Sequence, residues 1–192
     1  DFYEYSGKED AVYNSPKEAL KAVFGYDSFR AGQEEIINAI MEGRDALSVM
    51  PTGAGKSLCY QVPAMLLSGI TLVISPLISL MQDQVKALNE AGVSAAFINS
   101  SLSERAMNVT FKKASQGMYK IIYVAPERLM SEGFVRLAKG IEISMITVDE
   151  AHCISQWGQD FRPSYMDIAE FVNVLDKRPI ISAFTATATQ NV

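Results

Sequence analysis

Short runs of apolar residues recur along the chain and alternate with longer segments of mixed polarity. The apolar runs are Ala46–Met50, Thr71–Ser75, Ala95–Ile98, Lys120–Val124, Ser144–Val148 and Ile180–Phe184. Helix-length segments separate them, at Lys56–Leu67, Leu77–Glu90, Glu104–Ser115, Phe134–Lys139 and Met166–Leu175. Runs that are apolar almost throughout are typical of strands buried on both faces. We therefore expect an α/β fold of three layers, with a mainly parallel central sheet and helices on both faces.

Two further helices are expected before the first strand. One covers Pro16–Phe24, with Ser15 as its N-cap and a proline at its first position, which is a favoured start for a helix. The other covers Gln33–Met41 and ends near a glycine, which favours helix termination. We expect residues 1–14 to form an N-terminal extension and residues 1–192 to form a single domain, a length that can bury a core.

Polar or Gly/Pro segments follow five of the six expected strands. These segments are Pro51–Ser57, Ser75–Leu77, Ala125–Glu127, Asp149–His152 and Thr185–Thr187. The carboxyl ends of the strands in an open parallel sheet share one edge, and ligands bind at that edge. The pattern therefore predicts a single composite site built from five separate pieces of the chain.

The first of these segments has the features of a phosphate-binding loop. It lies between an expected strand and an expected helix, its glycines permit positive φ, and amides at a helix start attract anions. Lys56 is expected to reach the β and γ phosphates of ATP, and the hydroxyl of Ser57 to bind Mg²⁺. The predicted nucleotide contacts in the loop are Thr52, Gly53, Ala54, Gly55, Lys56 and Ser57.

The loop departs from the strict pattern, which has a glycine where this chain has Met50. A glycine-rich turn with an exposed lysine is therefore the alternative. The acidic segment after the fifth strand favours the phosphate site, because Asp149 at a strand tip suits the Mg²⁺ shell and Glu150 could activate the attacking water. The single histidine, His152, could be structural, but beside this pair we expect it to sense the γ-phosphate. The predicted catalytic residues are Lys56, Asp149, Glu150 and His152, and the predicted metal ligands are Ser57 and Asp149.

Composition restricts the classes of protein that remain. The net charge is 17 − 22 = −5, so any nucleic acid must bind at a local surface and not through bulk charge. Two isolated cysteines and one histidine make a structural zinc site unexpected. No apolar run approaches the roughly 18 residues of a membrane span, and residues 1–10 do not resemble a signal peptide. We expect a location in the bacterial cytoplasm or nucleoid, or in the nucleus of a eukaryote.

The segment Cys153–Tyr165, with the sequence CISQWGQDFRPSY, resembles the aromatic-rich loop of RecQ-family DNA helicases of superfamily 2. The phosphate loop and Asp149–His152 resemble the same family, and the likeness extends from about Phe24 to the end of the chain. The resemblance implies a RecA-like lobe that binds ATP and Mg²⁺. It also implies a 3′–5′ helicase that unwinds DNA in repair and recombination, with single strands and duplex junctions as partners.

The resemblance also implies a site for adenine. The segment Phe24–Gln33 is similar to the adenine-recognition motif of these helicases. Tyr26 and Arg30 would enclose the adenine ring, and Gln33 would form hydrogen bonds with its edge. An aromatic face, a planar guanidinium and an amide suit these contacts, although Tyr26 could instead be an ordinary packing residue.

Further segments resemble the motifs that contact DNA and couple hydrolysis to movement. Ser75–Leu80 and Ala125–Leu129 are similar to backbone-gripping motifs, which hold phosphates without reading sequence. Aromatic side chains of the loop can stack on bases, although one of them could be a buried anchor. The family usually has a histidine at the position of Gln159. The implied DNA-binding and coupling residues are Ser75, Pro76, Gln156, Trp157, Asp160, Phe161, Arg162, Thr185 and Thr187.

Superfamily 2 motors hold ATP between two RecA-like lobes, and the second lobe supplies an arginine finger. We expect this chain to contain the first lobe only, to be a monomer, and to lack the second lobe and the zinc-binding and winged-helix modules. Without the finger, hydrolysis should be poor, since that arginine contributes a factor of about 10³ or more. The alternatives are an RNA-directed DEAH-type helicase, another P-loop ATPase, or a non-catalytic nucleotide- or DNA-binding module.

Overall fold

The computed structural model describes residues 11–51, 55–156 and 158–186. Its centre is a six-stranded sheet in the order β1-β6-β5-β2-β4-β3. All neighbouring strands run parallel, where the sequence predicted a mainly parallel sheet. The strands are β1 (Ala46–Val49), β2 (Ile70–Ile74), β3 (Ala95–Ile98), β4 (Ile121–Val124), β5 (Ile143–Val148) and β6 (Ile180–Thr185). Each expected strand is therefore confirmed, with bounds that differ by at most one residue at either end.

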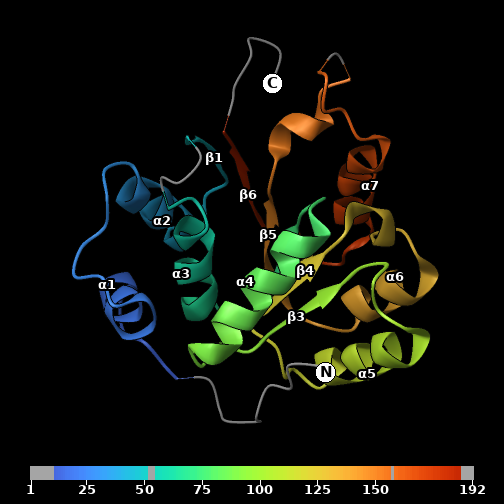
Figure 1. The fold of residues 1–192 in the computed structure, drawn as a ribbon, viewed down its shortest axis with the longest axis horizontal. Coiled ribbons are helices and arrows are strands. Elements are labelled where there is room, and N and C mark those ends of the chain that lie inside the picture. The colour runs from blue at the N-terminus through green and yellow to red at the C-terminus, as the bar shows by residue number, and fades with distance from the viewer. Residues whose placement is uncertain (1–10, 52–54, 157, 187–192) are drawn as a thin grey trace.

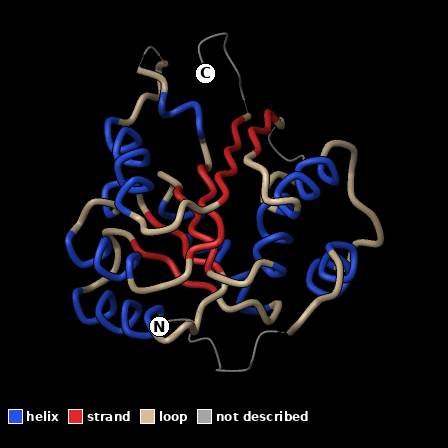
Figure 2. Tube along the Cα trace, turned by 180° about the vertical axis from the view of Figure 1, so that it is seen from behind, coloured by secondary structure: helices blue, strands red, loops and turns tan. Residues whose placement is uncertain are grey.

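Helices cover both faces of the sheet, as the alternating pattern predicted. One group comprises α1 (Pro16–Ala19), α2 (Gln33–Met41), α3 (Leu58–Leu66) and α4 (Ile78–Glu90). The other comprises α5 (Glu104–Ser115), α6 (Glu132–Lys139) and α7 (Asp167–Val174). Figure 1 shows α1, α2 and α3 on the left of the sheet and α5, α6 and α7 on the right. Seen from behind in Figure 2, the red strands run between these two groups of blue helices.

The first expected helix has an unexpected geometry in its second half. Its start is as predicted, because the hydroxyl of Ser15 accepts a hydrogen bond from the backbone of Glu18 at 3.2 Å. After α1, however, the chain continues as the π-helical turn η1 (Leu20–Phe24) and ends at Gly25, which has a φ of 76°. A pattern of apolar positions does not distinguish a π-helical turn from an α-helical one, since both bury one side of the segment.

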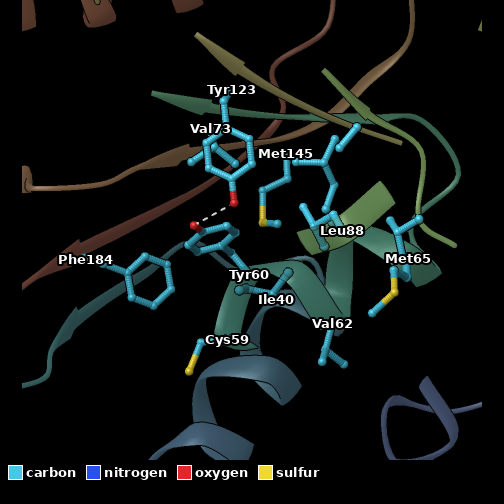
Figure 3. Packing of buried hydrophobic residues seen from close by; sticks show 14 of the residues in the cluster. Ile40, Cys59, Tyr60, Val62, Met65, Val73, Leu88, Tyr123, Met145 and Phe184 are labelled. Carbon is cyan, nitrogen blue, oxygen red and sulfur yellow. Dashed lines mark hydrogen bonds between the residues drawn. The ribbon is translucent and has the colours of Figure 1, made fainter. Parts of the chain in front are cut away.

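The two helical layers bury separate cores against opposite faces of the sheet. In the first core, Tyr60 of α3 contacts Tyr123 and Phe184 edge to face, with ring centroids 6.4 and 5.7 Å apart. Figure 3 shows the hydroxyl groups of Tyr60 and Tyr123 pointing at each other, 3.0 Å apart. In the second core, Phe134 and Phe171 stack with centroids 5.5 Å apart. Both faces of the sheet are therefore covered by largely apolar cores, which is typical of a parallel sheet.

Candidate active site

The segments that follow the strands begin side by side at one edge of the sheet. Backbone hydrogen bonds continue the sheet pattern beyond the strands, from Met50 to Thr185 at 3.0 Å, from Asp149 to Ile74 at 2.9 Å and from Ser75 to Val124 at 3.2 Å. These bonds join segments that are far apart in the sequence. The expected composite edge is therefore present in the described residues.

Lys56 and the acidic pair face each other across this edge. The Nζ atom of Lys56 lies 2.7 Å from Oδ1 of Asp149 and 3.6 Å from Oε1 of Glu150. The side chain of Asp149 is 6% exposed, and those of Lys56 and Glu150 are 21% and 23% exposed. Burial lowers the pKa of Lys56, but its hydrogen bond and attraction to the two carboxylates outweigh burial, so that the net pKa is raised. The lysine is therefore held charged beside two acids that follow β5, a strand far from Lys56 in the sequence.

Gln33 fastens the end of the phosphate loop to the segment before α2. Its buried amide nitrogen donates to the carbonyl oxygen of Gly55 at 3.1 Å, and its amide oxygen accepts from the backbone of Arg30 at 2.8 Å. Gly55 has a φ of 76°, as expected for the glycine before the lysine. A Cβ atom at this position would collide with the amide nitrogen of Gln33. The sequence suggested an adenine contact for Gln33 but not this structural role.

The acidic pair lies on an unusual turn at the end of β5. Among the residues that the structure describes, Glu150 is the one non-glycine with a positive φ, at 53°. Its backbone N–H donates to Oδ1 of Asp149 at 2.9 Å, and the hydroxyl of the buried Tyr165 donates to the carbonyl oxygen of Asp149 at 2.7 Å. The 3-10 turn η3 (Ala151–Ile154) begins directly afterwards. No simple sequence signal indicates a left-handed glutamate.

His152 connects three of the expected segments. Its Nδ1 atom lies 2.9 Å from the hydroxyl of Thr185 and 3.6 Å from Oε2 of Glu150. Its Nε2 atom lies 3.6 Å from Oδ2 of Asp160, in the loop that follows η3. The structure therefore brings the acidic pair, the end of β6 and the aromatic-rich loop together around one imidazole.

The expected adenine and DNA residues lie nearer the surface. Tyr26 is 51% exposed, and Arg30 is also exposed. Gln156, Asp160 and Arg162 are exposed, Pro76 and Phe161 are partly buried, and Ser75 is buried. The hydroxyl of Ser75 accepts a long hydrogen bond, of 3.4 Å, from the backbone of Leu77. Five expected site residues lie outside the described residues: Thr52, Gly53, Ala54, Trp157 and Thr187.

The oxygen groups at this edge are of the kind that can hold the magnesium ion of a bound nucleotide. Within the described residues, no group of three or more His, Cys, Asp or Glu side chains is arranged to hold a metal ion. Magnesium in nucleotide sites is usually held by one or two carboxylates together with phosphate oxygens and water. Asp149, with the hydroxyl of Ser57 at the start of α3, fits that chemistry.

A cavity lies at the opposite edge of the sheet. It has a volume of about 670 Å³ and is lined by residues at the amino ends of strands, including Ile70, Lys120 and Glu142. None of the expected catalytic residues lines it. The charged cluster, and not this cavity, therefore marks the candidate active site. No helix in the described part of the chain is both long enough and apolar enough to cross a membrane.

The parallel sheet between two helical layers and the charged cluster at its edge point to a helicase-type domain. Residues 30–192 match the model of the DEAD/DEAH box helicase family. The chain therefore belongs to the DEAD/DEAH box helicases.

Known relatives narrow the likeness to RecQ helicases. The ATP-dependent DNA helicase RecQ of Bacillus subtilis is 52% identical over 174 residues, which cover 90% of this chain and 29% of the relative. RecQ of Haemophilus influenzae is 52% identical over 169 residues, which cover 88% of this chain and 27% of the relative. The expected resemblance is confirmed, and the chain spans less than a third of the length of these relatives.

A solved structure supports the fold independently. The crystal structure of the DUF1998 helicase MrfA matches with a TM-score of 0.73 and 20% identity, over 96% of this chain and 31% of that one. At this identity the match shows the fold alone. It confirms the expected RecA-like arrangement of a parallel sheet between two helical layers.

Proposed function

We propose that this chain is the ATP-binding lobe of a RecQ-type DNA helicase, which couples ATP hydrolysis to 3′–5′ unwinding in DNA repair and recombination. The observation that carries the proposal is the contact of Lys56 with Asp149 and Glu150, 2.7 and 3.6 Å away. A lysine at the start of a helix, facing two carboxylates at a strand tip, is the charge arrangement that phosphoryl transfer from a magnesium nucleotide requires.

Each residue of this cluster has a distinct task in the proposal. Lys56 exchanges its carboxylate partners for the β and γ phosphates when the nucleotide binds. Bound Mg²⁺ would neutralise phosphate charge, and Asp149 with Ser57 would hold its shell. Glu150 accepts a proton from the attacking water as general base. His152, bonded to Thr185 and near Asp160, reports the state of the site to the coupling segment and the aromatic-rich loop.

Tyr26, Arg30 and Gln33 are the proposed contacts with the adenine of ATP. DNA is the proposed second ligand. Gln156, Asp160, Phe161 and Arg162 lie on or near the surface of the aromatic-rich loop, where side chains can stack on bases or pair with phosphates. Curated relatives with about half of their residues identical are named DNA helicases. These observations favour DNA over RNA as the nucleic acid that stimulates hydrolysis.

The phosphate role of Lys56 can be tested in the 192-residue chain. We expect Lys56→Ala to weaken binding of a fluorescent ATP analogue in the presence of Mg²⁺ by about 10- to 100-fold, since hydrogen bonds between charged groups contribute about 1.5–3 kcal/mol. Lys139→Ala, at the exposed end of α6, is the matched control and should bind normally. Equal affinities of the two variants would refute the phosphate site.

The catalytic and nucleic-acid roles need the full-length protein. There, Glu150→Gln should keep nucleotide affinity and lower kcat by about 10²- to 10⁴-fold, because an amide cannot act as the base. Single-stranded DNA should stimulate the native enzyme more than RNA of equal length. Greater stimulation by RNA would replace the proposed substrate with the alternative of an RNA-directed helicase.

A further inference from the structure

Tyr165 makes a single, well-defined polar contact with the acidic pair. Its ring is fully buried in the second core, at the end of the turn η4 (Pro163–Met166). Its hydroxyl donates to the carbonyl oxygen of Asp149 at 2.7 Å. Burial raises the pKa of Tyr165 far above its ordinary value. The hydroxyl therefore stays protonated, and remains a hydrogen-bond donor, over the whole pH range of an enzyme assay.

The hydrogen bond from Tyr165 lies next to a strained part of the backbone. The carbonyl that Tyr165 holds belongs to the peptide group that precedes Glu150, whose φ is 53° and ψ 46°. Such a conformation is unfavourable for a residue with a Cβ atom and persists only where its surroundings enforce it. Two hydrogen bonds enforce it here, from Tyr165 to the carbonyl of Asp149 and from the N–H of Glu150 to the Asp149 side chain.

Tyr165 also joins the acidic pair to the aromatic-rich loop. The backbone of Arg162 donates to the carbonyl of Cys153 at 3.0 Å and closes the loop at its base. The backbone of Tyr165 then donates to the carbonyl of Arg162, also at 3.0 Å. Two backbone hydrogen bonds and the Tyr165 hydroxyl therefore connect the base of the loop to the residue that precedes Glu150.

We propose that Tyr165 is a positioning residue for ATP hydrolysis, whose hydroxyl holds the Asp149 carbonyl and so keeps Glu150 in the left-handed conformation that aims its carboxylate into the site. The inference rests on the proposed function, because it takes Glu150 to be the general base. Tyr165 contacts neither Lys56 nor the Glu150 carboxylate in this account and acts through the backbone alone. Its removal should therefore disturb the chemical step and leave nucleotide binding unchanged.

The test compares two buried tyrosine hydroxyls in the full-length protein. Tyr165→Phe removes the bond to Asp149, and Tyr123→Phe is the matched control, because its hydroxyl is bonded to Tyr60 and Gln61 within the first core. We expect Tyr165→Phe to lower kcat by between about tenfold and about a hundredfold, the cost of a small misplacement of a catalytic group. KM for ATP and the affinity for the ATP analogue should not change. Tyr123→Phe should keep its kcat, even if it unfolds at a lower temperature.

A double variant separates this inference from the proposed function. If Tyr165 acts through Glu150, Tyr165→Phe should cause no further loss of rate in the Glu150→Gln background. An unchanged kcat in Tyr165→Phe, an equal loss in Tyr123→Phe, or an additive loss in the double variant would each overturn the positioning role. Full turnover by Glu150→Gln would instead refute the general base in the proposed function, whatever the result at Tyr165.

Discussion

The backbone at Glu150 leads to a stability prediction whose sign differs from that at an ordinary site. We compare Glu150→Ala with Glu150→Gly, because both changes remove the carboxylate and its contacts with Lys56 and His152. The difference between the two variants therefore reports the conformation of the backbone and little else. A second glutamate, Glu42, provides the control: its carboxylate pairs with Arg44 at 2.6 Å, and its φ is −81°.

The difference in the free energy of unfolding between the alanine and glycine variants follows from two opposing effects. Alanine held in the left-handed region costs about 1–2 kcal/mol, which glycine avoids. Glycine in turn loses about 0.4–1 kcal/mol through the greater freedom of the unfolded chain. At position 150 we therefore expect the glycine variant to be more stable than the alanine variant by about 0.8 kcal/mol, the difference between the midpoints of the two effects. At position 42, where φ is ordinary, the alanine variant should be more stable by about 0.4–1 kcal/mol.

Thermal unfolding of the 192-residue chain, followed by circular dichroism, measures both differences. For a chain of this size, 1 kcal/mol corresponds to a shift in Tm of about 2–4 °C, and urea titration provides an independent estimate. The reasoning is refuted if the alanine variant is as stable as, or more stable than, the glycine variant at position 150. The opposite order at position 42 ensures that the comparison can detect an effect of either sign.

Two further predictions concern contacts away from the site. Hydrogen bonding by Arg178 holds the pKa of Asp45 below its ordinary value of 3.8, so this contact contributes stability above that pH and loses it as the pH falls through the folded-state pKa. Asp45→Asn should therefore lower Tm at neutral pH, and the difference should shrink as the pH falls through the folded-state pKa; a difference that stays constant from neutral to acid pH would contradict this. Gln61→Met removes the hydrogen bonds from the buried amide to Gln84 and Tyr123, at 2.8 and 3.0 Å, and should lower the free energy of unfolding by about 1–3 kcal/mol. Urea titration beside the exposed control Gln116→Met would measure it, and equal stabilities would show that the amide bonds contribute nothing.

Much of the fold could be predicted because its strands are almost uniformly apolar. Runs such as Leu72–Ile74 must be buried on both faces, and alternation with helices then requires parallel strands whose carboxyl ends share an edge. That rule places Lys56 and Asp149 at the same edge, since each residue comes directly after its strand or the loop that extends it; their contact depends in addition on the strand order, in which β6 lies between β1 and β5. The shared edge did not require knowledge of the strand order.

The details that the sequence did not reveal depend on backbone geometry and on contacts between distant segments. Glu150 has no glycine or asparagine that would indicate a left-handed residue, and its conformation results from the bonds around Asp149. Gln33 appeared to be a ligand contact, yet its amide also fastens Gly55 to Arg30. Tyr165 was part of a recognised segment, but its partner lies 16 residues away on another element. Such pairings are set by packing, which local patterns do not encode.

The order of strands has a consequence for how the chain matures during synthesis. Among the described strands, β1 is paired with β6 alone, so the strand that leads into the phosphate loop pairs with the last strand described. Domains fold largely as units while they emerge from the ribosome, and β1 must wait for Ile180–Thr185 before it can be incorporated. Nascent chains arrested before that point should leave the first strand unpaired and exposed to chaperones, with no competent nucleotide site.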